Sequence, residues 1–243
     1  MNSIFIPNRG IINVYHFLIY MIANLRYVKF IPTNIYIDLN NEYFEQKHNY
    51  VIEILHALYP DTNIINATEC PVNCVSVYQE LVSFNREDGA SSDAYKYLRK
   101  IFIPILEQYK PTTNYSEYIY ISRMDDTDKR RVLNEKDMLS SDQFIHFQKI
   151  TASKIPLLEQ MYIFYKAKVI ISIHGAALVN ILFCNVNCKI VEIATHTISR
   201  LKHFEHISQV LNLNYCKFTD ITEFPNNQNL YNSDLMVNTF DIA

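Results

Sequence analysis

The segment KVIISIHGAALVNILFCNVNCKIVEI (residues 168–193) holds two β-branched runs with an apolar stretch between them. The runs KVIISI (168–173) and KIVEI (189–193) are typical of buried strands. The intervening AALVNILF (176–183) predicts a helix, so the expected order is strand, helix, strand. Strands joined through a helix pair in parallel. We therefore predict a βαβ unit of a parallel sheet.

Gly175 is one of three glycines in 243 residues, and it stands where the first of these strands turns into the helix. A residue without a side chain lets a ligand approach the backbone closely, and it also tolerates a left-handed turn. The N–H groups at a helix N-terminus favour a phosphate. His174 and Gly175 therefore predict a phosphate site, while a tight turn with nothing bound remains the alternative.

The same alternation continues along the chain. After residue 110 we expect further strands at 118–122, 144–150 and 214–218, and helices at 155–167 and 200–212. Strands separated by helices of this length indicate a doubly wound parallel sheet. Before residue 110 the pattern predicts a strand at 34–39 and helices at 11–26, 42–59 and 91–109. The Asn-rich residues 223–243 predict an extended tail.

The composition is that of a globular protein. Hydrophobic residues make up 49% of the chain and charged residues 19%, with a net charge of −3. The absence of a long basic run in the sequence argues against a nucleic-acid partner. The abundance of Asn, Ile, Tyr and Lys indicates an AT-rich genome, which suits a protist or a large DNA virus.

The apolar segment at residues 10–25 is interrupted by Asn13, Tyr15 and His16. These polar groups argue against a signal peptide and against a membrane span, which needs about 20 mostly apolar residues. We expect a buried amphipathic helix and a soluble cytoplasmic protein, in the host cytoplasm if the source is viral.

Five cysteines include two CxxxC pairs, Cys70/Cys74 and Cys184/Cys188. The pairs lie far apart in the sequence and no histidine has a finger-like spacing from them. We therefore expect thiols in a reducing compartment and not a zinc site.

Ligands of doubly wound sheets bind beyond the C-terminal ends of the strands. Three features fall at such ends: Ser122-Arg123, His174-Gly175 and Glu192. The guanidinium groups of Arg123 and Arg130 suit the oxygens of a diphosphate. A solvated basic loop, balanced by its aspartates, is the alternative.

Two further polar residues have competing interpretations. Asn134 precedes a short predicted helix, where it would cap the N–H groups in a capping box with Asp137. Glu192 is placed to accept both hydroxyls of a ribose, or to pair locally with Lys189 or Arg200.

The tripeptide Asp126-Thr127-Asp128 has the DxD form that holds a divalent cation on a diphosphate in one class of sugar-nucleotide transferases. Basic residues surround it and supply positive charge directly. We therefore favour a site without metal.

The order of these motifs resembles glycosyltransferase family 61, whose members include EGF-domain O-GlcNAc transferases and plant xylosyltransferases. The likeness is strongest from about residue 117 to 195 and weaker in GIINVYHFL (10–18). The family pattern is a strand ending in Ser-Arg, a later Arg before Leu-Asn-Glu, Glu-Gln, His-Gly-Ala-x-Leu-x-Asn, and a strand ending in Glu. The matching residues here are Ser122, Arg123, Arg130, Asn134, Glu135, Glu159, Gln160, His174, Gly175, Ala176, Leu178, Asn180 and Glu192.

The resemblance implies an α/β protein of GT-B type with two Rossmann-like domains. The domains would span residues 1–112, compact and facing the acceptor, and 113–222, which would bind the nucleotide sugar. It further implies an inverting, metal-independent transfer of xylose, GlcNAc or a similar sugar from a UDP-sugar or similar donor. The acceptor would be a hydroxyl of a glycan or glycoprotein, and no cofactor would be required. Carried over to this chain, donor contacts fall on Ser122, Arg123, Arg130, Asn134, His174, Gly175, Ala176, Asn180 and Glu192.

An inverting transfer needs a general base that removes the proton of the acceptor hydroxyl. His16, a polar group on an otherwise apolar helix of the facing domain, is the predicted base. A core histidine is the structural alternative for His16, and Asp125 or Asp126 is the reserve base. Two other functions stay open: a metal-dependent GT-A transferase using Asp126 and Asp128, and a nucleotide-binding module without activity.

Overall fold

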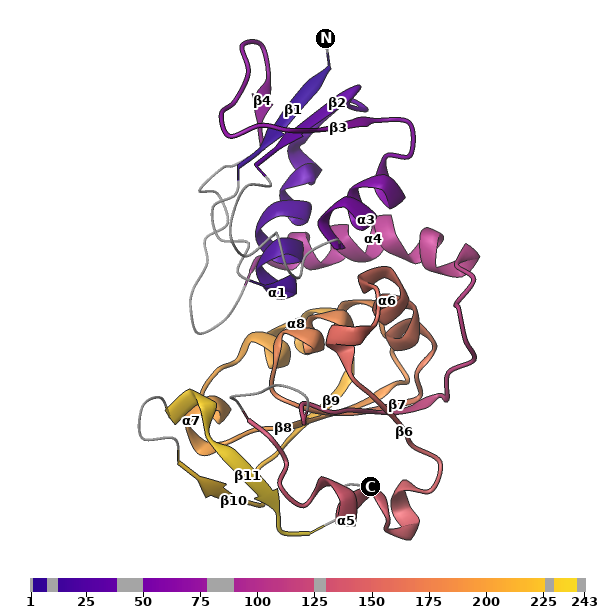
Figure 1. Cartoon of the computed structure of the whole chain (residues 1–243), viewed down its shortest axis with the longest axis vertical. Coiled ribbons are helices and arrows are strands. Elements are labelled where there is room, and N and C mark those ends of the chain that lie inside the picture. The colour runs from indigo at the N-terminus through magenta and orange to yellow at the C-terminus, as the bar shows by residue number, and fades with distance from the viewer. Residues whose placement is uncertain are drawn as a thin grey trace. The chain divides into compact units, whose positions relative to one another are not determined.

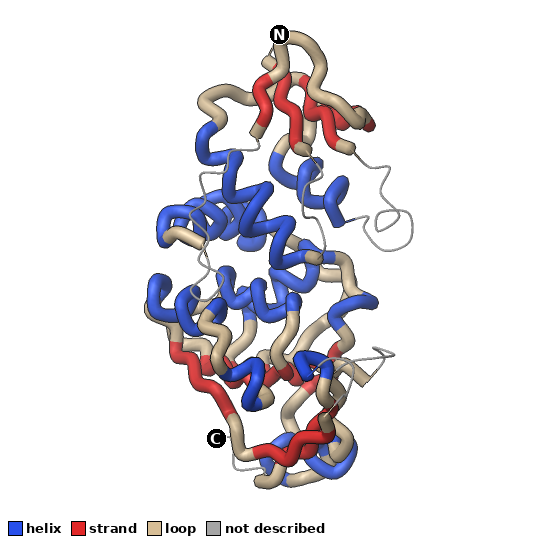
Figure 2. The backbone as a smooth tube through the Cα atoms, turned by 90° about the vertical axis from the view of Figure 1, so that its left-hand side faces the viewer, coloured by secondary structure: helices blue, strands red, loops and turns tan. Residues whose placement is uncertain are grey.

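The computed structural model describes residues 2–7, 13–38, 50–77, 90–124, 130–225 and 230–239. The chain divides into two compact units. Of the described residues, the first contains those up to Tyr109 together with Pro156–Leu158, and the second contains Lys110–Ile155 and those from Glu159 onward. The strands fall into separate groups, each with its own helices (Figure 2).

The N-terminal unit is built on a parallel sheet with the strand order β3-β2-β1-β4. Its strands are β1 (Ser3–Ile6), β2 (Asn34–Ile37), β3 (Asn63–Asn66) and β4 (Val75–Ser76). The helices are α1 (Val14–His16), α3 (Tyr50–Leu58) and α4 (Ser92–Gln108). Helix α1 continues into a π-helix (Phe17–Met21) and a 3-10 helix (Ile22–Tyr27), so the single helix predicted at 11–26 changes its winding twice.

The C-terminal unit is built on a second parallel sheet, with the order β6-β5-β7-β8-β9 (Figure 1). The strands are β5 (Tyr118–Ile121), β6 (Gln148–Ile150), β7 (Val169–Ile173), β8 (Lys189–Ile193) and β9 (Asn214–Phe218). The chain goes from β5 outward to β6 and then returns to the other side of β5. Strand order therefore reverses between β5 and β7, the place where doubly wound sheets bind their ligands. Both sheets are Rossmann-like, as predicted.

The two faces of the second sheet are covered differently (Figure 1). On one face lie α6 (Leu157–Lys166) and α8 (His203–Leu211). On the other lie α5 (Glu135–Leu139) and a hairpin of β10 (Ile221–Phe224) and β11 (Asp234–Val237). This second face is apolar, with a cluster that includes Tyr120, Ile171, Ile173, Val191, Ile193, Leu235 and Val237.

The hairpin corrects the prediction of an extended tail. Leu235 and Val237 are buried in the cluster just described. The Asn134 side chain donates from Nδ2 to the carbonyl of Val237 (2.8 Å) and accepts from the Val237 N–H (3.0 Å), as a neighbouring strand would. Asp234 accepts from the Arg131 guanidinium at 2.6 Å and 3.1 Å. These contacts attach β11 to the segment that follows β5.

Substituting Asp234 with asparagine should destabilise the protein at neutral pH. Burial raises the pKa of Asp234, but the hydrogen bonds and charge of Arg131 outweigh it and lower that pKa overall. A lowered folded-state pKa stabilises the protein above the unfolded pKa, and the contribution disappears as pH falls through the folded value. Since the Arg131 side chain is 39% exposed, we expect about 1 kcal/mol.

Urea unfolding of the parent and of Asp234→Asn at pH 7 and pH 3 measures this contribution. The gap between the two proteins should shrink at pH 3. A gap that is the same at both pH values would mean that the Arg131 ion pair does not stabilise the fold.

Two local predictions differ from the structure. The stretch 176–183 is a 3-10 helix and not an α-helix. Its β-branched residues Val179 and Ile181 have low α-helical preference. The strand expected at 144–150 begins at Gln148, because Phe144 ends a 3-10 turn (Asp142–Phe144). Part of the helix predicted at 42–59 lies outside the described residues.

Candidate functional site

The ends of β5 and β7 bring Arg123 and Gly175 together. A Cβ placed on Gly175 would lie 2.3 Å from Nη1 of Arg123 and 3.5 Å from its Cζ. Distances below 3.0 Å do not occur for real Cβ atoms, so the guanidinium occupies the space that a side chain at 175 would need. Arg123 therefore lies across the turn at the point where the strand order reverses.

The Gly175 backbone has φ 178° and ψ 170°, an extended conformation that any residue adopts. The left-handed turn considered from the sequence is therefore absent. A side chain at 175 would have to displace the guanidinium of Arg123, which occupies that space. The 3-10 helix starts directly afterwards, with the Leu178 N–H donating to the Gly175 carbonyl at 3.0 Å. Ala176, in the first position of that helix, is partly exposed.

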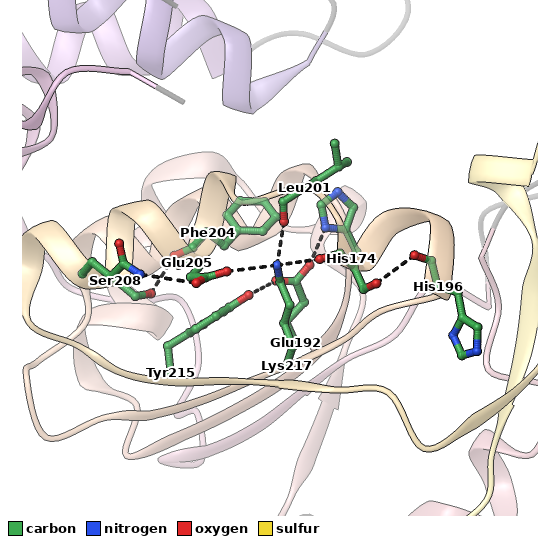
Figure 3. A network of polar contacts seen from close by, with 11 residues as sticks. His174, Glu192, His196, Leu201, Phe204, Glu205, Ser208, Tyr215 and Lys217 are labelled. Atoms are coloured by element: carbon green, nitrogen blue, oxygen red, sulfur yellow. Dashed lines mark hydrogen bonds and ion pairs between the residues drawn. The ribbon is translucent and has the colours of Figure 1, made fainter. Parts of the chain in front are cut away.

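The His174 side chain contacts Glu192, and Glu192 is in turn bound by Tyr215 (Figure 3). We call these three residues the His174 triad. Nδ1 of His174 contacts Oε1 of Glu192, and the Tyr215 hydroxyl donates to Oε2 of the same carboxylate. Glu192 is 1% exposed. Both of its oxygens thus have protein partners inside the fold. The contact of Glu192 with a ribose stays a prediction.

Tyr215 keeps its hydrogen under all ordinary conditions. Burial, as the largest cause, and the negative charge of Glu192, as the next, raise the pKa of Tyr215 far above the usual tyrosine range. The hydroxyl is therefore a permanent donor to Glu192. Lys217 stands opposite Glu192 in the sheet register, yet its described hydrogen bonds go to the carbonyls of Ser199 (3.0 Å) and Leu201 (2.6 Å) and to the carboxylate of Glu205 (3.4 Å).

Ser122 has a structural role at the end of β5. Its hydroxyl donates to Oε2 of Glu135 at 2.7 Å and accepts from the Met124 N–H at 3.2 Å. Glu135 is 3% exposed and also pairs with Lys149. Burial and this carboxylate raise the pKa of Tyr120 well above its usual value. Ser122 therefore fixes the backbone beside Arg123, and its donor contact stays a prediction.

Asn134 is likewise structural. It stands at the N-cap position of α5, but its side chain makes no capping hydrogen bond. Both of its polar atoms bind Val237 instead. The capping box with Asp137 is therefore wrong, and the donor contact of Asn134 stays a prediction. Arg130 lies nearby in the left-handed backbone region, with φ 59°.

Three further polar residues of the family pattern are buried: Glu159, Gln160 and Asn180. Oε1 of Glu159 accepts from the hydroxyls of Thr112 (2.6 Å) and Tyr115 (3.0 Å). Asn180 is fully buried, and its amide donates to Gln160 at 3.4 Å. The predicted contact of Asn180 with a donor stays a prediction.

His16, the predicted base, belongs to the N-terminal unit. Its ring is partly exposed and lies edge-on to Tyr15 and Tyr20, at centroid distances of 5.9 Å and 5.2 Å. Asp125, Asp126 and the second aspartate of the DxD lie outside the described residues.

Two other features bear on ligand binding: a surface pocket and the distribution of metal-binding side chains. A surface pocket of about 530 Å³ lies between α8 and β9, lined by residues that include Ser208, Asn212 and Cys216. It stands at the outer edge of the sheet, whereas Arg123 and Gly175 lie together at the strand-order reversal, where we place the site. Among the described residues, no three or more His, Cys, Asp or Glu side chains gather to hold a metal ion.

The fold is that of a doubly wound α/β protein, with the cationic side chain of Arg123 at the strand-order reversal, where such sheets bind their ligands. A family model described as Glycosyltransferase 61 matches residues 14–191. The chain belongs to glycosyltransferase family 61 and is a glycosyltransferase, which implies a nucleotide-sugar donor and a glycan acceptor. None of the curated proteins compared with it matches the chain. Helices long and apolar enough to cross a membrane are absent from the described part.

Proposed function

We propose that the protein catalyses an inverting, metal-independent transfer of a sugar from a UDP-sugar or similar donor. The sugar would be xylose, GlcNAc or a close relative, and the acceptor a hydroxyl of a glycan or protein. The observation that carries this proposal is the Arg123 guanidinium lying across Gly175 at the strand-order reversal. A permanent cation fixed at that point suits a diphosphate.

The reaction is one displacement at the anomeric carbon. The acceptor oxygen forms a bond to that carbon while the bond to the diphosphate oxygen breaks on the opposite face. Arg123 and Arg130 would stabilise the charge that develops on the leaving diphosphate. The backbone N–H of Ala176, at the start of the 3-10 helix, would add a neutral donor. His174 would contact the same diphosphate.

The general base would come from the N-terminal unit, in a two-domain arrangement of GT-B type. His16 is our first candidate, because an imidazole accepts a proton near neutral pH. Asp126 is the second. Kinetics of His16→Gln and Asp126→Asn with an active donor and acceptor separate them: loss of the base lowers kcat by about 100-fold or more, whereas a residue outside the reaction leaves it unchanged.

UDP should raise the melting temperature of the protein equally with and without EDTA. The physical reason is that arginine supplies the positive charge which a divalent cation supplies in DxD enzymes. Thermal melts with UDP, with UDP and EDTA, and with UDP and Mn²⁺ test this expectation. A stabilisation that appears only with Mn²⁺ would favour the metal-dependent alternative built on Asp126.

A further inference from the structure

Glu192 is a buried carboxylate at the edge of the candidate site. It sits on β8, opposite Ser172 of β7 and Lys217 of β9 in the sheet register. Its two oxygens are taken by two different partners, His174 and Tyr215. Burial of a carboxylate is costly unless it is fully hydrogen-bonded, so this arrangement needs both partners.

The hydrogen-bond directions within the triad follow from the chemistry of the groups. An ionised carboxylate only accepts, and the Tyr215 hydroxyl donates to one of its oxygens. Nδ1 of His174 must therefore carry a hydrogen toward the other. Nε2 is left on the side of the ring away from Glu192 (Figure 3).

The ring of His174 is also fixed by packing. The Phe204 ring of α8 lies against it, with centroids 5.2 Å apart and planes tilted by 54°. The His174 N–H donates to the Ile193 carbonyl at 2.9 Å, which fixes the backbone at the end of β7. The orientation of the His174 ring and its tautomer are thus both determined before a ligand binds.

We propose that Glu192 and Tyr215 are positioning residues that hold His174 with Nδ1 committed to the carboxylate and Nε2 presented to the donor diphosphate. This rests on the proposed function, since it assigns a donor contact to His174. A carboxylate that fixes one ring nitrogen so that the other can act on substrate is the logic of the Ser-His-Asp triad. A hydrogen bond from Nε2 to a diphosphate oxygen requires a hydrogen on Nε2 as well, because a phosphate oxygen is an acceptor here.

The experiment compares Glu192→Gln and Tyr215→Phe with the parent, using UDP as the probe. Titration calorimetry gives the UDP affinity, and long-range ¹H–¹⁵N spectra of the ligand-free protein report which ring nitrogen of His174 is protonated. His174→Ala assigns the signals. Tyr95→Phe is the matched control, because it removes a buried hydroxyl that accepts from the Ala90 N–H (2.8 Å) in the N-terminal unit.

We expect Glu192→Gln to weaken UDP binding about 10-fold, as loss of an outer partner of a functional histidine does elsewhere. An amide can donate to Nδ1 and favour the other tautomer, so the His174 ring signals should change. Tyr215→Phe should weaken binding about 5-fold. Tyr95→Phe should change neither measurement. In the His174→Ala background, Glu192→Gln should have no further effect on UDP affinity.

Unchanged ring signals in Glu192→Gln would overturn the proposal, because Glu192 would then not determine the state of His174. A loss of UDP affinity that persists without His174 would overturn it as well. If the parent bound no UDP, that result would count against the proposed donor, while the spectra of the ligand-free protein would still test the triad.

Discussion

Gly175→Val is expected to abolish detectable UDP binding in a protein that remains folded. The valine Cβ would lie 2.3 Å from Nη1 of Arg123, so the guanidinium must leave its place. The backbone at 175 is extended, with φ 178°, and valine adopts that conformation without strain. The damage should therefore fall on the position of Arg123 and not on the turn. Calorimetric titration with UDP and a circular-dichroism melt measure the two effects separately.

A graded series sharpens this expectation. Gly175→Ala adds the same Cβ with less bulk and should weaken binding by less than valine does. His174→Ala removes a single hydrogen bond, worth about 1 to 3 kcal/mol according to its charge, and should also be milder than Gly175→Val. In the Arg123→Ala background, Gly175→Ala should lose most of its effect. Folded Gly175→Val that binds UDP like the parent would show that glycine serves only the chain's own packing.

Arg123→Ala should weaken UDP binding by about 30- to 150-fold with little change in melting temperature. A charge-assisted hydrogen bond contributes about 2 to 3 kcal/mol where solvent is restricted. Arg123→Lys keeps the charge but loses the planar fork that matches two phosphate oxygens. We expect about a 10-fold loss for lysine, between the parent and alanine.

The control for charge is Lys166→Ala, which removes an exposed cation at the C-terminus of α6. Helix α6 ends just before β7 begins, so Lys166 lies at the opposite end of the strands from Arg123. Its loss should leave UDP affinity unchanged. Should Arg123→Ala unfold instead of binding weakly, Arg123 would be a structural residue and the diphosphate assignment would fail.

The C-terminal sheet was predictable because its strands are apolar and regularly spaced. Four of the five, β5, β7, β8 and β9, carry β-branched or aromatic residues separated by helical patterns, whereas β6 is the short stretch Gln148–Ile150, whose start was predicted wrongly. In the N-terminal unit, β1, β3 and β4 escaped prediction. β4 is two residues long and exposed, and β3 has asparagine at both ends, so neither shows the apolar run by which strands are recognised.

The candidate site was predictable in part. The rule that ligands bind at strand ends led to Arg123 and Gly175, which the structure brings into contact. The partner of Glu192 was not predictable from spacing, because it depends on which face of β8 the side chain occupies. Tyr215 had no signal of its own: it is one of eighteen tyrosines in the sequence, and its role appears once β9 pairs with β8.

The roles of Asn134 and the tail were missed together. A polar residue before a helix is most often a cap, and an Asn-rich C-terminal stretch is most often irregular. In the structure the Asn134 side chain binds Val237 of this C-terminal stretch, across a sequence separation of 103 residues. Local patterns carry no information about such a pair.

That separation has a consequence for the order in which the protein is made. Synthesis proceeds from the N-terminus, and domains fold as their segments emerge. Strands β5 to β9 can pair once Phe218 is available. The segment bearing Arg130 and Arg131 cannot be attached until β11 emerges, because Asp234 and Val237 hold it. The nascent chain can thus complete this sheet before β11 attaches the segment that bears Arg130 and Arg131.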